Sequence, residues 1–490
     1  MLGDDDLLSP SLVTQSWFLD ELLGRSSASN ISRPKKRKRV TNKQPRQGDL
    51  TQARGAVRWW IPLPAGVWDE LRRPERYDES SWDAKKFMSI FGVPAKVFDE
   101  LVKEASLHVT LRGKTRIGDG RRGPISKPLE LKVAASLEIC QAGLLFKTAE
   151  RLYKISQPVL EPFFHEFMKL MVLHEYWKHV YPPESRTDID RVLSRHARLG
   201  FPGAITMFDG TKWEWGNCPH AYRFAHIGKE GYPTRLFMVG GDANGMAHHV
   251  HGSHPGARND LTASKFDEFL LSLRDGTRYP NETFELYSAD GASVRHCRPW
   301  SVTDNGFHRW RECQFPSKVS QEEWLRRWSK RMESVRKPGT ECIYGRMKKR
   351  FRILAIPCSF DCESKMDNCF RFLVMLHNRN QRHFGLDTLG DEEADWKAAN
   401  THLDDERIAR EVGGAALGVP HYVDDRAVGN DTEAEFEASW ASLRAALVTH
   451  FRIMWERKEV KWLKPATECR PNYRTDPGIR RTGRAEADEV

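Results

Sequence analysis

The sequence predicts an α/β fold in which a mixed β-sheet is flanked by helices and an all-helical region precedes the sheet. Short apolar runs bounded by glycine begin near residue 200, and such runs are typical of buried strands. Longer segments with helical periodicity occupy residues 91–199. Further helical segments alternate with the strands after residue 260, which is the pattern of a layered α/β domain.

Length and charge narrow the class of protein. The chain has 490 residues, of which 39% are hydrophobic, and a formal net charge of +10. It is long enough for more than one domain with a sizeable core. The positive charge favours a polyanionic partner, and double-stranded DNA fits better than a membrane because no apolar run approaches the roughly 20 residues of a membrane helix. Nine scattered cysteines are typical of reduced thiols in an intracellular protein.

Residues 1–55 are polar and are predicted to be a disordered basic arm, followed by an ordered connector over residues 56–90. The arm carries a run of cations that must stay in water: Lys35, Lys36, Arg37, Lys38 and Arg39. A basic run led by Pro34 in an exposed arm favours a nuclear import signal, so we expect a nuclear protein. Direct binding to phosphate and a merely solvated charge run are the alternatives.

Residues 91–199 are predicted to be helical and contain a candidate DNA-binding motif. Two amphipathic segments, 147–153 and 159–173, are separated by a short turn. Ser156 suits the cap of the second helix, and Pro158 suits its first turn. Helices joined in this way form either a helix-turn-helix that reads DNA or an ordinary helical hairpin, and the sequence leaves both open.

Residues 200–388 are predicted to form the catalytic domain. The apolar run 203–208 predicts a first strand with Asp209 at its carboxyl end, where open α/β sheets bind ligands, although Asp-Gly is also a common turn. The elements expected after it are a hairpin over 235–251, a helix over 260–273, a strand over 282–289, and helices over 318–337, 341–351 and 367–377. The order strand, hairpin, helix, strand, helix is that of a ribonuclease H-like core.

Acidic residues are predicted to converge on one edge of this sheet. The first and fourth strands are neighbours in such a core, so Asp209 and Asp290 would face each other, with Glu341 on a helix packed against the same edge. Converging carboxylates without nearby cations repel unless divalent metal neutralises them. Two Mg²⁺ ions, or Mn²⁺ in their place, suit hard oxygen ligands. Asp260 is a further catalytic and metal-ligand candidate, although its position also suits a helix N-cap.

The helix that begins at Glu341 is also predicted to contact DNA. Glu341, Gly345, Lys348 and Arg352 follow helical spacing and would share one face. The acid would then face metal while Lys348 and Arg352 contact phosphate, and an exposed ion-paired helix is the alternative. Pro338-Gly339 should break a helix that enters Glu341 smoothly, although Thr340 could cap a fresh one.

Histidines gather where the third strand is expected: His248, His249, His251 and His254. Alternation along a strand would divide these side chains between its two faces. Such a division between faces disfavours a zinc site there.

Motifs between about residues 90 and 390 resemble those of PIF/Harbinger-type DDE transposases, a group that includes Harbinger transposase-derived nucleases. Each motif alone is weak evidence for the resemblance, but together the motifs occur in the same order as in the family. In chain order they are Asp209-Gly210-Thr211-Lys212-Trp213, Gly256-Ala257-Arg258-Asn259-Asp260, Tyr287-Ser288-Ala289-Asp290-Gly291, Glu333-Ser334-Val335-Arg336-Lys337 with Glu341, and Leu376-His377-Asn378.

The resemblance implies an Mg²⁺-dependent endonuclease and transposase that cuts transposon-end DNA and joins it to target DNA by two-metal phosphoryl transfer. Asp209, Asp290 and Glu341 match its catalytic and metal-binding residues, and Asp260 lies in another acidic block. Topology favours Asp290 over Asp260 as the second ligand, because only Asp290 would end a core strand. We also expect a homo-oligomer on double-stranded DNA, with a Myb-like helper protein.

Two other functions fit the same pattern. One is a domesticated nuclear DNA-binding or scaffold protein that no longer cuts. The other is an exonuclease or ribonuclease with the same core, although the basic arm favours long duplex DNA.

Residues 389–490 are predicted to be a charged C-terminal tail with one helix near 436–457. An apolar stripe on this helix comprises Trp440, Leu443, Leu447 and Phe451. Packing on the core explains such a stripe better than binding a partner does.

Overall fold

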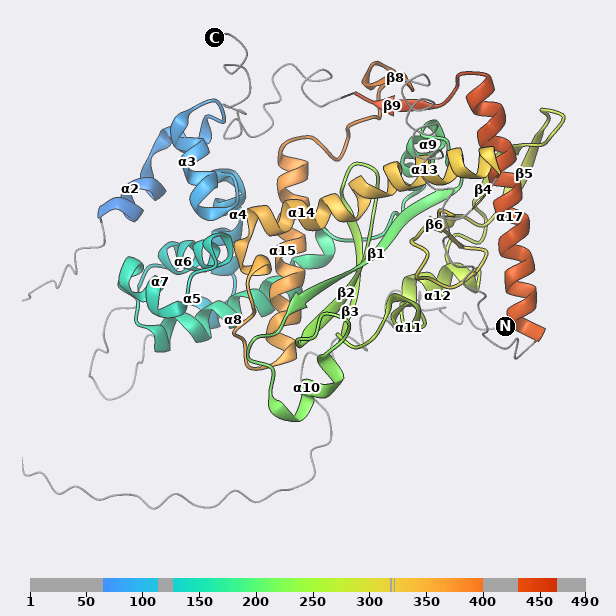
Figure 1. The fold of residues 1–490 in the computed structure, drawn as a ribbon. Coiled ribbons are helices and arrows are strands. Elements are labelled where there is room, and N and C mark those ends of the chain that lie inside the picture. The colour runs from blue at the N-terminus through green and yellow to red at the C-terminus, as the bar shows by residue number, and fades with distance from the viewer. Residues whose placement is uncertain (1–64, 113–126, 318–319, 321, 400–430, 465–490) are drawn as a thin grey trace, which may run out of the picture. The chain divides into compact units, whose positions relative to one another are not determined.

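The computed structural model describes residues 65–112, 127–317, 320, 322–399 and 431–464 (Figure 1). The predicted basic arm, with its cations at 35–39, lies outside these residues. The described residues all belong to one compact unit, residues 61–490. In its described part, no helix combines the length and the apolar character needed to cross a membrane.

The architecture is mixed α/β, with a five-stranded mixed sheet flanked by helices (Figure 1). In spatial order its strands are β3 (Ala247–Pro255), β2 (Thr234–Gly241), β1 (Ala204–Glu214), β6 (Trp300–Val302) and β7 (Cys313–Gln314). The first three are antiparallel neighbours, which confirms the predicted hairpin, whereas β1, β6 and β7 run parallel. The remaining described strands form two small two-stranded sheets.

The central strand β1 is longer than predicted. Its pairing with β2 runs from Met207 to Glu214, so Asp209 lies opposite Val239 in mid-strand. The predicted position of Asp209 at the strand end, and the alternative of an Asp-Gly turn, are therefore wrong. Pairing with β6 on the other side stops at Met207, so Asp209 lies just past the point where that flank of β1 loses its partner.

The strand expected beside β1 is a different one. The predicted fourth strand exists as β4 (Thr283–Tyr287), but it pairs with β5 (Ser293–Cys297) in a separate hairpin. Its burial alternates, with Phe284 and Leu286 inward, as in a strand covered on one face. All three residues of β6 are buried, and a strand inside a parallel arrangement is buried on both faces. The predicted adjacency of the first and fourth strands is therefore wrong.

In the part of the chain before the sheet that the structure describes, the regular elements are helices. They are α2 (Ala65–Arg72), η1 (Pro74–Tyr77), α3 (Trp82–Phe91), α4 (Ala95–Ser106), α5 (Val109–Arg112), α6 (Leu129–Ala142), α7 (Phe146–Tyr153), α8 (Gln157–His174), η2 (Tyr176–Lys178) and α9 (Arg186–Arg198). The predicted pair of helices joined by a short turn is α7 and α8. Because α8 packs Phe167 edge-on against Phe372 of α15 (Glu363–His383), one of its faces belongs to the core.

The helices after β1 carry or support the acidic residues. They are α10 (His220–His226), α11 (Asp260–Ser264), α12 (Glu268–Arg274), α13 (Glu323–Gly339), α14 (Glu341–Arg350), η3 (Arg352–Ala355) and α15. The single helix predicted over 260–273 is divided, because Asp267 leaves the helical conformation and caps α12 by accepting the N–H of Leu270 at 3.0 Å.

The described C-terminal elements close one face of the sheet. They are η4 (Glu393–Asp395), β8 (Trp396–Ala398), α17 (Asp431–Glu456) and β9 (Lys461–Leu463). Leu443, Leu447 and Phe451 of α17 lie in the same buried cluster as Trp300 of β6 and Trp328 of α13. Packing on the core is therefore confirmed for most of the predicted stripe.

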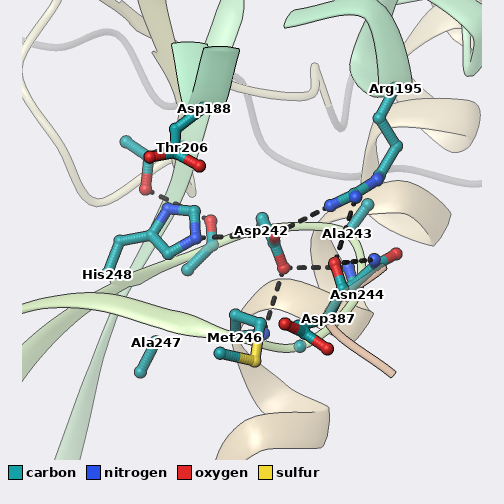
Figure 2. A network of polar contacts seen from close by, with 12 residues as sticks. Asp188, Arg195, Thr206, Asp242, Ala243, Asn244, Met246, Ala247, His248 and Asp387 are labelled. Carbon is teal, nitrogen blue, oxygen red and sulfur yellow. Dashed lines mark hydrogen bonds and ion pairs between the residues drawn. The ribbon is translucent and has the colours of Figure 1, made fainter. Parts of the chain in front are cut away.

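A buried polar network fixes the turn between β2 and β3 (Figure 2). Asp242 accepts a hydrogen bond from the N–H of Asn244 at 2.9 Å and pairs with Arg195 of α9 at 3.0 Å. Burial alone would raise the pKa of Asp242, but the hydrogen bond and charge of His248, together with Arg195, hold it well below its usual value. Arg195 also pairs with Asp391 at 2.6 Å. The network therefore joins α9, the hairpin turn and the chain after α15.

Candidate catalytic site

Asp209 is the centre of a group of interacting carboxylates. Its side chain on β1 is only 17% exposed. Burial raises its pKa to about 6, and the negative charges of Asp304 and Asp260 contribute to the rise, while Arg336 opposes it. The structure therefore brings Asp209 and Asp260 together, as predicted, and adds a third acid that the sequence interpretation missed.

Asp304 is this missed acid. It follows β6 after Thr303, and β6 is the parallel neighbour of β1, so Asp304 occupies the strand-end position where α/β sheets bind ligands. Its Oδ1 accepts the N–H of Gly306 at 2.8 Å. A weak signal was present, because the run Trp300-Ser301-Val302 comes just before this acid and Gly306 follows it two residues later. That run is only three residues long, too short for a strand prediction.

Asp260 lies at the start of α11 with its carboxylate against β1. Asn259, not Asp260, is the helix cap, since its Oδ1 accepts the N–H of Thr262 at 2.8 Å; the N-cap alternative for Asp260 is therefore wrong. A Cβ at Gly210 would collide with Oδ1 of Asp260, so glycine beside Asp209 is needed for this approach. Burial raises the pKa of Asp260, and Asp304 raises it further.

Asp290 is not part of this group. It is fully exposed in the turn between β4 and β5, where its carboxylate accepts hydrogen bonds from the hydroxyl of Ser288 and from the N–H of Ala292. These two hydrogen bonds lower its pKa. The topological preference for Asp290 over Asp260 was wrong, because β4 is not a strand of the large sheet.

Glu341 begins α14 directly after a helix break. The break predicted at Pro338-Gly339 occurs, since α13 ends at Gly339 and α14 starts at Glu341. Thr340 does not cap α14, because its hydroxyl donates instead to the carbonyl of Arg336 at 3.0 Å. Glu341 is half exposed and faces Arg336.

Arg336 joins two of the predicted acids. Its Nη1 donates to Oδ2 of Asp209 at 2.7 Å, and its Nη2 donates to Oε1 of Glu341 at 2.9 Å. Its side chain is 11% exposed. The expectation that these carboxylates lack a nearby cation is therefore wrong for this pair. Arg336 had entered the sequence argument only as part of a motif.

Two glycines hold the helix break against the sheet. A Cβ at Gly339 would lie 2.7 Å from Sδ of Met207 and 2.8 Å from the carbonyl oxygen of Asp242. A Cβ at Gly241 would lie 2.5 Å from the carbonyl oxygen of Gly339. Only residues without side chains permit this approach, so Pro338-Gly339 seats the α13–α14 junction on β1 and β2.

The candidate phosphate ligands lie on and beyond α14. Lys348 is exposed and borders a shallow pocket with Thr211 and Lys212. Arg352 is exposed in η3, beyond the end of α14 at Arg350, so the prediction that it shares one helix face with Glu341 is wrong. Tyr344 of the same helix donates to the backbone carbonyl of Asp209 at 2.7 Å, which ties α14 to β1.

Comparison with known protein families gives a match over the central part of the chain. Residues 178–382 match the family described as plant transposon protein. The matched segment runs from the end of η2 nearly to the end of α15, so it contains every acid of the site, as well as Arg336. No curated protein and no solved structure matches the chain. The central part of the chain is therefore related to transposon proteins.

Proposed function

We propose that the chain is a DDE-type endonuclease and transposase of the PIF/Harbinger kind, which cuts transposon-end DNA and joins it to target DNA. The observation that carries this proposal is the convergence of Asp209, Asp260 and Asp304 within the segment related to transposon proteins. The sheet order supports a ribonuclease H-like core, since an antiparallel hairpin flanks one side of β1 and parallel strands flank the other.

Asp209 and Asp304 are the proposed metal ligands, with Asp260 and Glu341 completing the set. The raised pKa values of Asp209 and Asp260 indicate that the site favours additional positive charge. Its donors are carboxylate oxygens, which suit Mg²⁺ or Mn²⁺. When bound, two such ions would supply an activated attacking oxygen and stabilise the leaving one at phosphorus.

The chain's own residues position these ligands and the DNA. In the metal-free chain Arg336 neutralises Asp209 and Glu341 and holds Glu341 toward β1, and a bound ion would take its place on these oxygens. Lys348 and Arg352, both exposed, would bind backbone phosphates of the duplex, which is the usual source of DNA affinity. A nuclear location, a homo-oligomer on DNA and a Myb-like helper protein remain predictions from the sequence.

The test uses the purified full-length chain, Mg²⁺ and duplexes with the genomic sequence on either side of the gene, where transposon ends would lie. Asp304→Asn and Asp290→Asn form a matched pair. Each acid accepts a hydrogen bond from the backbone N–H two residues further on, but only Asp304 is assigned to metal. We expect Asp304→Asn and Asp209→Asn to lower the rate of nicking by more than about 100-fold. Even substitution of a residue that only hydrogen-bonds to a metal ligand lowers metal affinity or activity by about 10–100-fold. Asp290→Asn should cut like the unaltered chain.

Two outcomes would contradict this assignment. Loss of nicking in Asp290→Asn with full activity in Asp304→Asn would restore the sequence-based choice. Undiminished nicking by Asp209→Asn would remove the metal-dependent mechanism from this site altogether.

A domesticated protein that binds DNA without cutting is the second candidate. The ion pairs of Arg336 with Asp209 and Glu341 favour it, because they neutralise part of the site without metal. This function predicts binding to duplex DNA with no nicking in either Mg²⁺ or Mn²⁺.

A further inference from the structure

Three histidines of β3 lie on one face of the sheet. Directly opposed residues of paired strands share a face. His254 opposes Leu236, His251 opposes Met238, and His249 opposes Gly240. Since Leu236 and Met238 both pack in the cluster beneath α12, these histidines face that cluster.

A β-bulge makes this arrangement. Between the pairs Leu236–His254 and Met238–His251, β3 advances by one residue more than β2. The extra residue lies near Gly252, whose φ of +39° is in the left-handed region. Alternation alone places His249 and His251 on one face, with His248 and His254 on the other. The bulge brings His254 to the face of His249 and His251, whereas His248 turns away and pairs with Asp242. The predicted division between two faces is therefore wrong for His254 only.

A buried carboxylate completes the cluster. Asp267, between α11 and α12, is fully buried, and its Oδ2 lies 3.2 Å from Nε2 of His249. One ligand atom each from His249, His251 and Asp267 lie within 4.8 Å of one another. Ligands of a tetrahedral zinc ion lie about 3.3 Å apart, given zinc–ligand distances of about 2.0–2.1 Å. A small movement of these side chains toward one another would bring the three ligand atoms to that spacing.

The ring nitrogens of this cluster are short of hydrogen-bond partners. Within the described part of the chain, His251 makes no hydrogen bond, and Nε2 of His254 is buried without a partner. The His251 and His254 rings lie 5.1 Å apart. Neutral imidazole is a usual zinc ligand.

We propose that His249, His251 and Asp267 form a binding site for a zinc-like transition-metal ion, separate from the acidic site. Two nitrogens and one oxygen suit such an ion better than they suit Mg²⁺. His254, with its unpartnered nitrogen, is the nearest candidate for a fourth ligand. The ion links the edge strand β3 to the turn after α11.

The position of this site gives it a structural role. Asp260 begins α11 and Asp267 follows it, so the ion fixes one end of the short helix whose other end carries an acid of the candidate catalytic site. The ring of His249 also lies 5.8 Å from that of Phe208, which directly precedes Asp209. The ion would therefore hold two elements that position the carboxylates.

The test measures Zn²⁺ binding by the full-length chain after metal removal, in competition with a chromophoric chelator and with excess Mg²⁺ present. His251→Gln removes one proposed ligand without removing a hydrogen bond. His220→Gln, at an exposed position in α10, is the matched control. Asp209→Asn tests whether Zn²⁺ binds at the acidic site instead.

We expect one tightly bound Zn²⁺ in the unaltered chain, in His220→Gln and in Asp209→Asn. His251→Gln should bind it at least about 100-fold more weakly. Zn²⁺ should raise the melting temperature of the first three proteins but not of His251→Gln, and far-UV circular dichroism checks that this variant folds. Equal Zn²⁺ affinity in His251→Gln, or no tight Zn²⁺ in the unaltered chain, would overturn the proposal. Neither readout depends on DNA cleavage, so the outcome is independent of the proposed transposase activity.

Discussion

Arg336 and Asp209 form an ion pair at 2.7 Å although 127 residues separate them in the chain. Both side chains are largely buried, at 11% and 17% exposed. The pairing only partly offsets the cost of burying Asp209, since the pKa of this acid is still raised to about 6. The acid is therefore held in a conformation that a bound cation would stabilise, and this has measurable consequences.

Asp209→Asn should stabilise the metal-free protein at high pH. The pKa of Asp209 rises from 3.8 to about 6 on folding, so between these values the folded chain binds more protons and the free energy of unfolding falls as pH rises. Ionisation of the buried Asp209 therefore lowers the free energy of unfolding by roughly 1–3 kcal/mol, and this loss reaches its full value above about pH 7. In metal-free urea unfolding the variant should gain this amount at pH 8 and nothing at pH 4. A less stable variant at pH 8 would contradict the burial argument.

Arg336→Gln should strengthen binding of Mg²⁺. The guanidinium occupies Oδ2 of Asp209 and Oε1 of Glu341, so it competes with the ion for these oxygens. Removing one competing charged interaction of about 1.4 kcal/mol should increase the affinity for Mg²⁺ about tenfold. The measurement is the Mg²⁺ concentration that half-maximally raises the melting temperature. Lys337→Gln, its exposed neighbour on α13, should not change this concentration, and weaker Mg²⁺ binding in Arg336→Gln would make the arginine a helper rather than a competitor.

Gly339→Ala should destabilise the fold and displace Glu341. The new Cβ would lie 2.7 Å from Sδ of Met207 and 2.8 Å from the carbonyl oxygen of Asp242. Relieving the second contact requires the backbone itself to move, which costs free energy. We expect a loss of about 1–3 kcal/mol, with reduced nicking. Gly345→Ala is the control, because Gly345 is exposed in α14 with nothing within 4 Å of its Cβ position. That change should stabilise the protein by about 0.5–1 kcal/mol. Equal effects of the two changes would argue against the close approach at Gly339.

Lys348→Gln and Arg352→Gln should weaken DNA binding in a salt-dependent way. Each lost phosphate contact should reduce the slope of log affinity against log salt by about 0.9 for duplex DNA. The measurement is fluorescence anisotropy of a labelled duplex over a series of salt concentrations. Lys96→Gln, at an exposed position of α4, serves as the control with equal loss of charge. An unchanged slope in Lys348→Gln and Arg352→Gln would exclude these residues from the DNA-binding surface.

The sequence predicted the elements in which the hydrophobic periodicity extends over many residues. The β2–β3 hairpin, α13 and the core-facing stripe of α17 have long or strongly patterned signals, and all were found. The strand β6 was missed because three buried residues carry too little periodicity. The sequence-based prediction placed β4 beside β1 instead. For that reason it selected Asp290, which follows β4, and not Asp304, which follows β6.

Local irregularities account for the other differences. At His254 the alternation rule failed because a β-bulge between His251 and His254 shifts the register by one residue. At Arg336 composition and spacing say nothing about a partner 127 residues away. Asp209 was recognised as a site residue because its own apolar run, 203–208, is longer than the three residues of β6. Its place in mid-strand depends on pairing with β2 that no local pattern reveals.

The packing of α17 has a consequence for synthesis of the protein. Phe451 of α17 lies beside Phe201, with 6.4 Å between ring centroids, and it shares a buried cluster with Trp300 and Trp328. These three aromatic residues leave the ribosome well before α17 does, so the nascent chain carries an uncovered apolar face until its last segment emerges. A chain interrupted before α17 would be a substrate for chaperones and proteases, even though it already contained every acid of the candidate site.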